Sequence, residues 1–187
     1  MFETGSFSIT AASSQVQAQS MHKPGGCLLF LQGGIKGRIV ESGTDSHGRW
    51  AYTKYRRNIG PPITVIVTYQ VVDTDPRRSG PTTYATQLYA AYIGENRYRP
   101  ERLRHHHAHD LVAFVKSCQS KGESVIIAGD FNEVMGETDR GLTKLHSECS
   151  LIDAVLDKHG ATEFTTYQRG QSIIDYIMVD PHIYSCI

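Results

Sequence analysis

Residues 125–137 read VIIAGDFNEVMGE, the pattern of a buried strand that runs into polar residues. On extended backbone, side chains alternate between two faces, so we expect Asp130 and Asn132 to point the same way and Phe131 to point toward the core. In layered α/β proteins, the loops that leave the carboxyl ends of strands form the usual binding crevice. A carboxylate there can accept a proton from water or help to hold a metal, and an amide can donate to a phosphoryl oxygen. The alternative is local, because Asp and Asn after Gly are also favoured turn residues that bond their own backbone.

The composition is that of one globular domain. The chain has 187 residues, of which 40% are hydrophobic and 20% charged. The formal net charge is zero, so no global field draws the protein to nucleic acid or to a membrane, and an anionic substrate needs a local patch. No apolar run has membrane-spanning length. The four cysteines form no C-x-x-C pair and are typical of reduced thiols, which favours an intracellular location, either nuclear or cytoplasmic.

Strand signals follow a polar segment at residues 1–24, which we expect to be a poorly ordered lead-in without strands. Two extended runs at 27–32 and 35–42 flank a Gly-Gly pair, a pattern typical of a β-hairpin. The β-branched run at 63–72 predicts a central strand that is buried on both faces. Further strands are predicted at 49–57 and 124–129, with a closing hairpin formed by 163–168 and 172–179.

Helix signals lie between these strands. Thr82 or Thr83 is the predicted cap of one helix, and Gly160 ends another that begins near residue 151. Two apolar stripes predict further amphipathic helices, one of Ala108, Leu111, Val112, Val115 and Cys118, the other of Leu142, Leu145 and Cys149. Six or seven strands on a largely antiparallel plan, with helices between them, predict an α/β layered sandwich formed by residues 25–187.

A second carboxylate, Asp175, lies in the apolar run SIIDYIMVD at 172–180. An unpaired buried carboxylate costs on the order of several kcal/mol, so Asp175 needs either a partner or a place at the open end of the sheet. One interpretation is a hydrogen-bonded or ion-paired aspartate of the core. The other is a carboxylate that orients a catalytic histidine, as in other acid–histidine pairs.

Together, GDFNE at 129–133 and TTYQRGQSIIDYIMV at 165–179 resemble the endonuclease/exonuclease/phosphatase superfamily, which includes DNase I-like nucleases, exonuclease III-type apurinic endonucleases and sugar-phosphate phosphatases. The chain is most similar to the endonuclease domains of retroelements, whose order of KPGG, HGRW, VTYQV and LIDAVLDKHG it shares, and the resemblance covers about residues 24–183. It implies a four-layer α/β/β/α sandwich, one divalent cation (Mg²⁺ or Mn²⁺) and DNA as the partner.

The resemblance also implies roles for four residues. Asp130 would help to activate the attacking water and is a possible contributor to the metal site, and Asn132 would bind the scissile phosphate. Asp175 would orient the catalytic histidine of the family. Tyr69 matches a tyrosine that donates to the phosphate, although the Pro-Asn that usually follows is absent here.

Other family residues are missing from their expected places. Only 24 residues precede the first predicted hairpin, and Glu3 is too close to Pro24 to match the metal-binding glutamate. No Ser-Asp-His strand follows IDYI, and His182 comes too soon to be the catalytic histidine. We therefore expect a domain that is incomplete at both ends. Three functions remain open: a metal-dependent DNA endonuclease, a catalytically inert remnant, and a phosphatase of the same superfamily.

Several further residues have both a local and a functional interpretation. His105 and His109 have a spacing that can bind metal on a helix, or they belong to a solvated helix start. The six arginines between residues 77 and 104, with Lys54, Arg56 and Arg57, form a possible track for a phosphate backbone or a solvated surface. We expect Trp50 to belong to the core and Asp153 to stabilise its helix locally.

Overall fold

The computed structural model describes residues 6–11, 25–137, 141–160, 165–167 and 172–186. Its elements in chain order are β1 (Ser6–Ala11), β2 (Cys27–Gln32), the 3₁₀ helix η1 (Gly33–Arg38), β3 (Ile39–Thr44), β4 (Trp50–Tyr55), β5 (Ile63–Tyr69), α1 (Tyr84–Gly94), α2 (Leu103–Gln119), β6 (Ser124–Asp130), α3 (Leu142–Cys149), β7 (Ile152–Asp153), α4 (Ala154–His159), β8 (Asp175–Val179) and α5 (Pro181–Tyr184).

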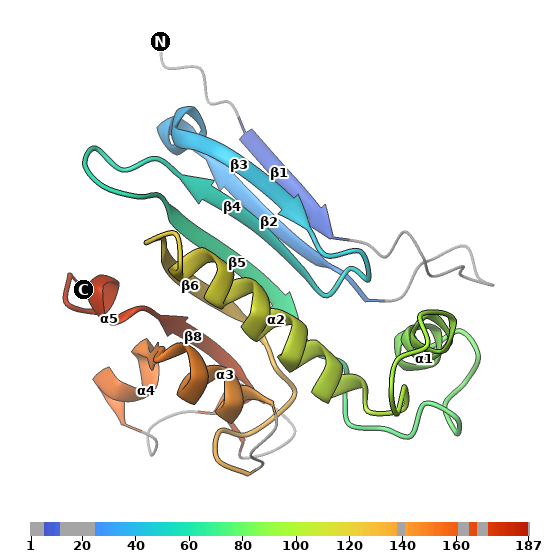
Figure 1. The fold of residues 1–187 in the computed structure, drawn as a ribbon. Coiled ribbons are helices and arrows are strands. Elements are labelled where there is room, and N and C mark those ends of the chain that lie inside the picture. The colour runs from blue at the N-terminus through green and yellow to red at the C-terminus, as the bar shows by residue number, and fades with distance from the viewer. Residues whose placement is uncertain (1–5, 12–24, 138–140, 161–164, 168–171, 187) are drawn as a thin grey trace.

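Six strands form one large mixed sheet in the order β3-β4-β5-β6-β8-β7 (Figure 1). The pair β5–β6 is parallel and the other four pairs are antiparallel, which confirms the largely antiparallel plan. The close approach of the two central strands requires a glycine in β6. A β-carbon at Gly129 would lie 1.9 Å from the carbonyl oxygen of Thr68 in β5.

Helices α2 and α3 cover one face of this sheet (Figure 1). Both predicted apolar stripes are buried there against Ile66, Val125, Ile127 and Met178. Burial of a full aliphatic side chain stabilises a fold by about 1.5–3 kcal/mol, so this interface is the main core. Trp50 also belongs to it, as predicted.

The opposite face of β5 is only half-buried, so the prediction of burial on both faces is wrong. Thr64, Ile66 and Thr68 are buried, whereas Val65 and Val67 between them are partly exposed. A small sheet of β1 and β2 packs against β4 and β5 on this side. Within the described residues this small sheet has two strands, and Ile177 of β8, on the same face of the large sheet, is exposed.

The first predicted hairpin is also wrong. Strand β2 pairs antiparallel with β1, not with β3, and β3 pairs with β4 in the other sheet. The Gly-Gly pair begins η1, with Gly33 at a φ of 77°, and this glycine-rich turn takes the chain from the small sheet to the large one. Strand β1 corrects a further expectation, because it lies within the lead-in that was predicted to hold no strand; the rest of residues 1–24, including Glu3, lies outside the described residues.

The described residues form three layers: helices, the large sheet and the small sheet. The predicted fourth layer, helices over the outer face of the small sheet, stays a prediction. On that face Leu28 and Phe30 are exposed. Of the predicted partner strand at 163–168, residues 165–167 are described and do not form a strand, whereas 163, 164 and 168 lie outside the described residues, as does the turn before Ser172.

Local helix signals are confirmed. The Thr83 hydroxyl accepts the N–H of Thr86 at 3.3 Å and caps α1, and Asp153 accepts two backbone N–H groups at the start of α4. Gly160 ends α4 with a φ of 77°. The four cysteines are free thiols, with Cys118 and Cys149 buried. Within the described ranges, no helix is long and apolar enough to cross a membrane.

A set of charges around the buried Arg49 fixes α1 and α2 to the start of β4; we call it the arginine network. Arg49 donates to Asp45 at 2.7 Å and to Asp110 at 2.9 Å, and Arg97 donates to Asp110 and Glu95, both at 2.7 Å. Next to it, the hydroxyl of Tyr84 in α1 donates to the carbonyl of His47 at 2.8 Å. Because the network fixes α1, it also places the ring of Tyr84 against Tyr69 at the end of β5.

Candidate active site

Three predicted residues form a row across adjacent strands, which we call the strand-end row. Tyr69 of β5 is the register partner of Asp130 of β6, and Asp130 is the register partner of Asp175 of β8. Register partners share a face of the sheet, so the three side chains project from the same side. This is the half-exposed side on which the small sheet lies. The structure thus brings together a phenol and two carboxylates that are far apart in sequence.

Asn132 departs from the predicted geometry. The strand ends at Asp130, and Asn132 has a φ of 47°, so the two side chains do not lie on one extended backbone. The N–H of Asn132 donates to Oδ1 of Asp130 at 2.9 Å, which is the local turn that the sequence left open as an alternative. Phe131 is buried, as predicted. The Asn132 side chain still belongs to the site, because it is close enough to Tyr69 to lower the pKa of that phenol.

Two residues that the sequence analysis did not select hold this turn. The Nε of Arg104 donates to the carbonyl of Val71 at 3.0 Å, and its Nη2 donates to the carbonyl of Asn132. The Nε2 of Gln70 donates to the carbonyl of Phe131 at 2.8 Å.

The carboxamide of Asn132 completes the link, since its Nδ2 donates to the carbonyl of Gln70 at 2.7 Å. Arg104 appeared in the sequence only as one basic residue among several. Its contacts to backbone carbonyls could not be predicted from the sequence, because they join residues that are far apart along the chain.

Burial and a like charge raise the pKa of Asp130. Partial burial is the main cause, the N–H of Asn132 opposes it, and the negative charge of Asp175 raises the pKa further. The positive charge of Arg104 lowers it. Burial also raises the pKa of Tyr69, with a further contribution from Asp130, so the phenol stays protonated. The site therefore combines an acceptor for a proton with a donor for an anionic oxygen.

Asp175 lies at the open end of the sheet, one of the two places that the sequence analysis allowed. It is exposed and starts β8, because the strand begins at Asp175 and not at residue 172. This excludes the interpretation as a buried core aspartate. The hydroxyl of Thr166 accepts the N–H groups of Ile174 and Asp175 at 2.9 and 3.1 Å. Among the described residues, no hydrogen bond or ion pair joins Asp175 to a histidine.

The two carboxylates line one open cavity of about 300 Å³. Its other lining residues are Ala128, Gly129, Val155, Thr166, Tyr176 and Ile177. Oxygen ligands are what Mg²⁺ prefers, and it is commonly held by one or two carboxylates together with water and substrate phosphates. Asp130 and Asp175 fit such a partial shell. In the part of the chain that the structure describes, no cluster of three or more His, Cys, Asp or Glu side chains could hold a metal ion. His105 and His109 therefore belong to no such cluster.

The structure removes several residues from the possible basic track. Lys54 is buried and pairs with Glu41 at 3.0 Å and with Glu123 at 3.1 Å, so it is not available to a phosphate. Arg56 and Arg57 follow the carboxyl end of β4, which is antiparallel to β5, and so lie at the opposite end of the sheet from the strand-end row. Arg97 belongs to the arginine network. Arg77, Arg78, Arg99 and Arg102 are exposed, although Arg77 pairs with Asp75 at 2.9 Å.

Comparison with known proteins identifies the family to which the chain belongs. The sequence model described as Endonuclease/Exonuclease/phosphatase family matches residues 21–185. No curated protein sequence matches the chain. Among solved structures, the human Nocturnin catalytic domain with bound sulfate anion is similar with a TM-score of 0.53 and 16% sequence identity, and this likeness shows the fold. The match covers 95% of this chain and 62% of the Nocturnin chain.

Two structures of NExo are more distant. The 3′ phosphatase NExo from Neisseria bound to product DNA hairpin has a TM-score of 0.42 and 16% identity, over 75% of this chain and 55% of that chain. The 3′-5′ exonuclease NExo from Neisseria meningitidis has a TM-score of 0.42 and 18% identity, over 75% of this chain and 56% of that chain. Likeness at this level carries no argument about the site.

Proposed function

Because the chain belongs to the endonuclease/exonuclease/phosphatase family of metal-dependent phosphodiester hydrolases, we propose that it is the core of a DNA endonuclease of the retroelement or apurinic type. The single observation that carries this proposal is the strand-end row, in which a phenol and two carboxylates share one face of the sheet beside an open cavity. An open site suits an extended polyanion.

Each residue of the site has a chemical role in this proposal. Asp130 accepts a proton from the attacking water. Tyr69 donates its hydroxyl proton to a phosphoryl oxygen. The carboxamide of Asn132 donates one hydrogen to the carbonyl of Gln70 and lies beside Tyr69, where it would contact the same phosphate. Asp130 and Asp175 would hold the divalent cation, which stabilises charge on the phosphoryl group when it is bound.

The role of Asp175 differs from the one that the family resemblance implies. Without a histidine bonded to it among the described residues, Asp175 has no imidazole to orient there. We propose that it acts as the second carboxylate of the cation site. We also expect weak activity from this chain alone, because removal of one donor to a developing oxyanion typically costs about a hundred- to a thousand-fold in rate.

Nicking of supercoiled plasmid by the purified chain in the presence of Mg²⁺ tests the proposal. We expect trace nicking that is lost in Asp130→Ala and kept in the matched control Asp157→Asn, an exposed aspartate in α4. Equal nicking by Asp130→Ala would exclude the proposed site. Complete absence of nicking in the unmodified chain would favour the inert remnant.

The phosphatase alternative needs a separate substrate. Release of phosphate from a small phosphomonoester, measured against plasmid nicking, separates the two. We expect no phosphate release that depends on Asp130.

A further inference from the structure

The connection between α1 and α2, residues 95–102, has an unusual backbone that is held in place. Asn96 and Arg99 have φ values of 55° and 52°, which few residues other than glycine adopt. The N–H of Arg97 donates to the carbonyl of Tyr92 at 3.0 Å, and the carbonyl of Arg99 lies 3.2 Å from the His106 ring. The side chain of Arg97 is taken up by the arginine network and lies 4.5 Å from the Tyr92 ring.

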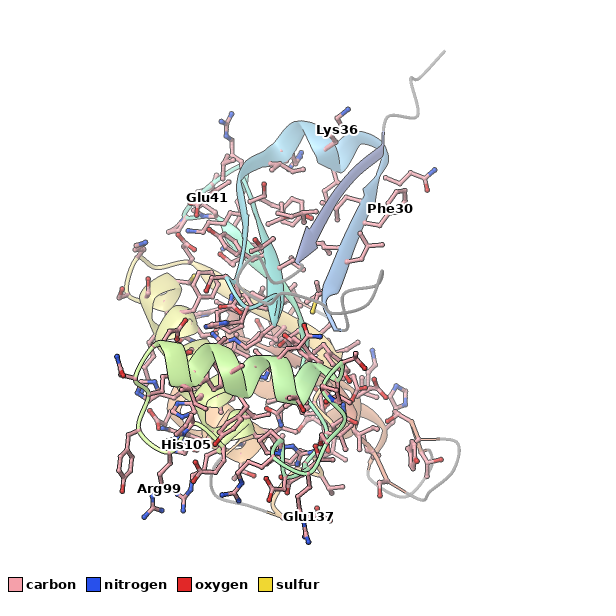
Figure 2. All side chains as sticks on the ribbon, turned by 90° about the vertical axis from the view of Figure 1, so that its right-hand side faces the viewer. Phe30, Lys36, Glu41, Arg99, His105 and Glu137 are labelled. Atoms are coloured by element: carbon pink, nitrogen blue, oxygen red, sulfur yellow. The ribbon has the colours of Figure 1, made fainter. Side chains whose placement is uncertain are left out.

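This fixed connection presents an exposed aromatic ring next to a cation. Tyr98 is 78% exposed, and the Arg99 guanidinium lies 5.2 Å from the centre of its ring. Exposure of a large aromatic side chain favours a stacking partner, and an adjacent arginine strengthens stacking on nucleic-acid bases. Figure 2 shows Arg99 projecting from the same end of the molecule as His105 and Glu137, and Lys36 at the opposite end.

Part of the positive charge of this segment is not paired. Residues 96–104 contain four arginines and one acidic residue, Glu101. Arg97 is neutralised by Glu95 and Asp110. Arg99 and Arg102 are exposed and form no ion pair with any residue that the structure describes. Two exposed cations near a stackable ring suit a nucleic-acid strand, in which phosphates and bases alternate.

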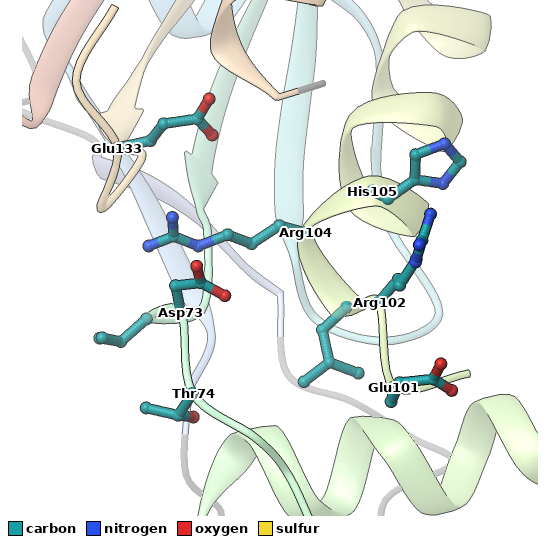
Figure 3. Close-up of a pocket in the computed structure, with 9 residues that line it drawn as sticks. Asp73, Thr74, Glu101, Arg102, Arg104, His105 and Glu133 are labelled. Atoms are coloured by element: carbon teal, nitrogen blue, oxygen red, sulfur yellow. The ribbon is translucent and has the colours of Figure 1, made fainter. Parts of the chain in front are cut away.

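A cavity lies between this segment and Arg104, which contacts the turn at Asn132. It has a volume of about 270 Å³ and is lined by Asp73, Glu101, Arg102, Arg104, His105 and Glu133 among others (Figure 3). Arg104 in its wall donates to the carbonyl of Asn132. The wall of this cavity therefore extends from Arg102 to the turn at Asn132, which follows Asp130.

We propose that Tyr98, Arg99 and Arg102 form a docking surface for single-stranded nucleic acid that holds the strand beside the cleaved phosphate. A base stacks on Tyr98, and the two arginines neutralise neighbouring phosphates. The link to the cleaved phosphate rests on the proposed function, whereas binding to the surface can be measured without hydrolysis.

Fluorescence anisotropy of a labelled oligothymidylate, with EDTA present to prevent hydrolysis, tests this surface on the full chain. Tyr98→Ala should weaken binding about 5- to 150-fold, the equivalent of about 1–3 kcal/mol for one stacked base. Tyr98→Phe should restore most of the affinity. The double change Arg99→Gln with Arg102→Gln should weaken binding and make the slope of log K against log salt shallower by about 1.4, since each phosphate contact contributes about 0.7.

The matched control is Arg56→Gln with Arg57→Gln, which removes the same charge at the opposite end of the sheet. Unchanged affinity in Tyr98→Ala, or an equal loss in the control, would overturn the proposal. Tighter binding of a duplex of the same sequence than of the single strand would overturn it as well. If the chain nicks plasmid but Tyr98 has no effect on binding, the docking surface is wrong and the proposed hydrolysis stands. If binding depends on Tyr98 but the chain does not nick plasmid, the proposed hydrolysis is wrong and the docking surface stands.

Discussion

The arginine network and the strand-end row place ionised side chains at the same end of the large sheet but treat their charge in opposite ways. In the network, burial opposes ionisation of Asp110, but hydrogen bonds and charges from Arg97 and Arg49 outweigh it and lower the pKa of Asp110 to about 2. In the row, Asp130 faces another carboxylate, and its pKa is raised. One cluster holds its charges in compensated pairs, and the other keeps an excess of negative charge beside a cavity. Uncompensated charge of this kind is typical of functional sites, where stability is not the property being optimised.

The largest expected effect comes from breaking the network. Arg49→Met leaves Asp45 and Asp110 without their shared partner, and loss of one member of a buried ion pair typically costs about 3–5 kcal/mol. Urea unfolding at neutral pH measures the change. Arg77→Met, which removes the exposed pair with Asp75, is the matched control and should cost less than about 1 kcal/mol. Equal effects of the two substitutions would show that the network contributes no more than a surface pair.

A smaller effect is expected from the neutral histidine beside the network. Burial, with a contribution from the Arg49 charge, lowers the pKa of His107 to about 3. Its Nε2 lies 3.0 Å from the Thr68 hydroxyl, which itself donates to the carbonyl of Arg49, so the histidine nitrogen is the donor. Below pH 6.5 the unfolded chain binds a proton that the folded chain excludes, so stability falls as pH decreases from about 6.5 toward 3.

Urea unfolding at pH 7 and pH 5 measures this dependence. His107 should account for a loss of about 2 kcal/mol between the two conditions, since each pKa unit is worth about 1.4 kcal/mol. His107→Gln keeps a hydrogen-bond donor without a titrating group, and its stability should depend less on pH by this amount. A variant that loses as much stability at pH 5 as the unmodified chain would contradict the assignment.

The smallest effects concern the balance of charge around Asp130. Asp175→Asn removes the like charge and should lower the pKa of Asp130, whereas Arg104→Gln removes the opposing cation and should raise it. NMR titration of the Asp130 side-chain carboxyl carbon measures both shifts without any need for activity. Shifts of the same sign in the two variants would show that the changes act through structure and not through charge.

Most elements of the fold were predictable because their signals are local. The stripe from Ala108 to Cys118 follows helical periodicity, and the caps Thr83 and Asp153 act within three residues. The pairing of strands was harder. The segment 27–32 reads as half of a hairpin, but its partner β1 was hidden in a polar segment, and nothing local specifies which sheet a strand joins.

The candidate site was predictable to a similar degree. Asp130, Asp175 and Tyr69 meet because the register of three strands aligns them, whereas the geometry of Asn132 depends on a turn held by Gln70 and Arg104. The misassigned role of Lys54 has the same cause, since its partner Glu123 is distant in sequence.

Gly129 has a consequence for how related sequences diverge. The strand-to-strand contact at Thr68 admits no side chain at this position, so any replacement displaces one of the two central strands. Selection for a folded protein alone therefore preserves the glycine, even in lineages whose copies no longer cleave anything. The adjacent Asp130 is under no such steric constraint. A related sequence that has lost the aspartate but kept the glycine would therefore be a domain that still folds but no longer catalyses the reaction.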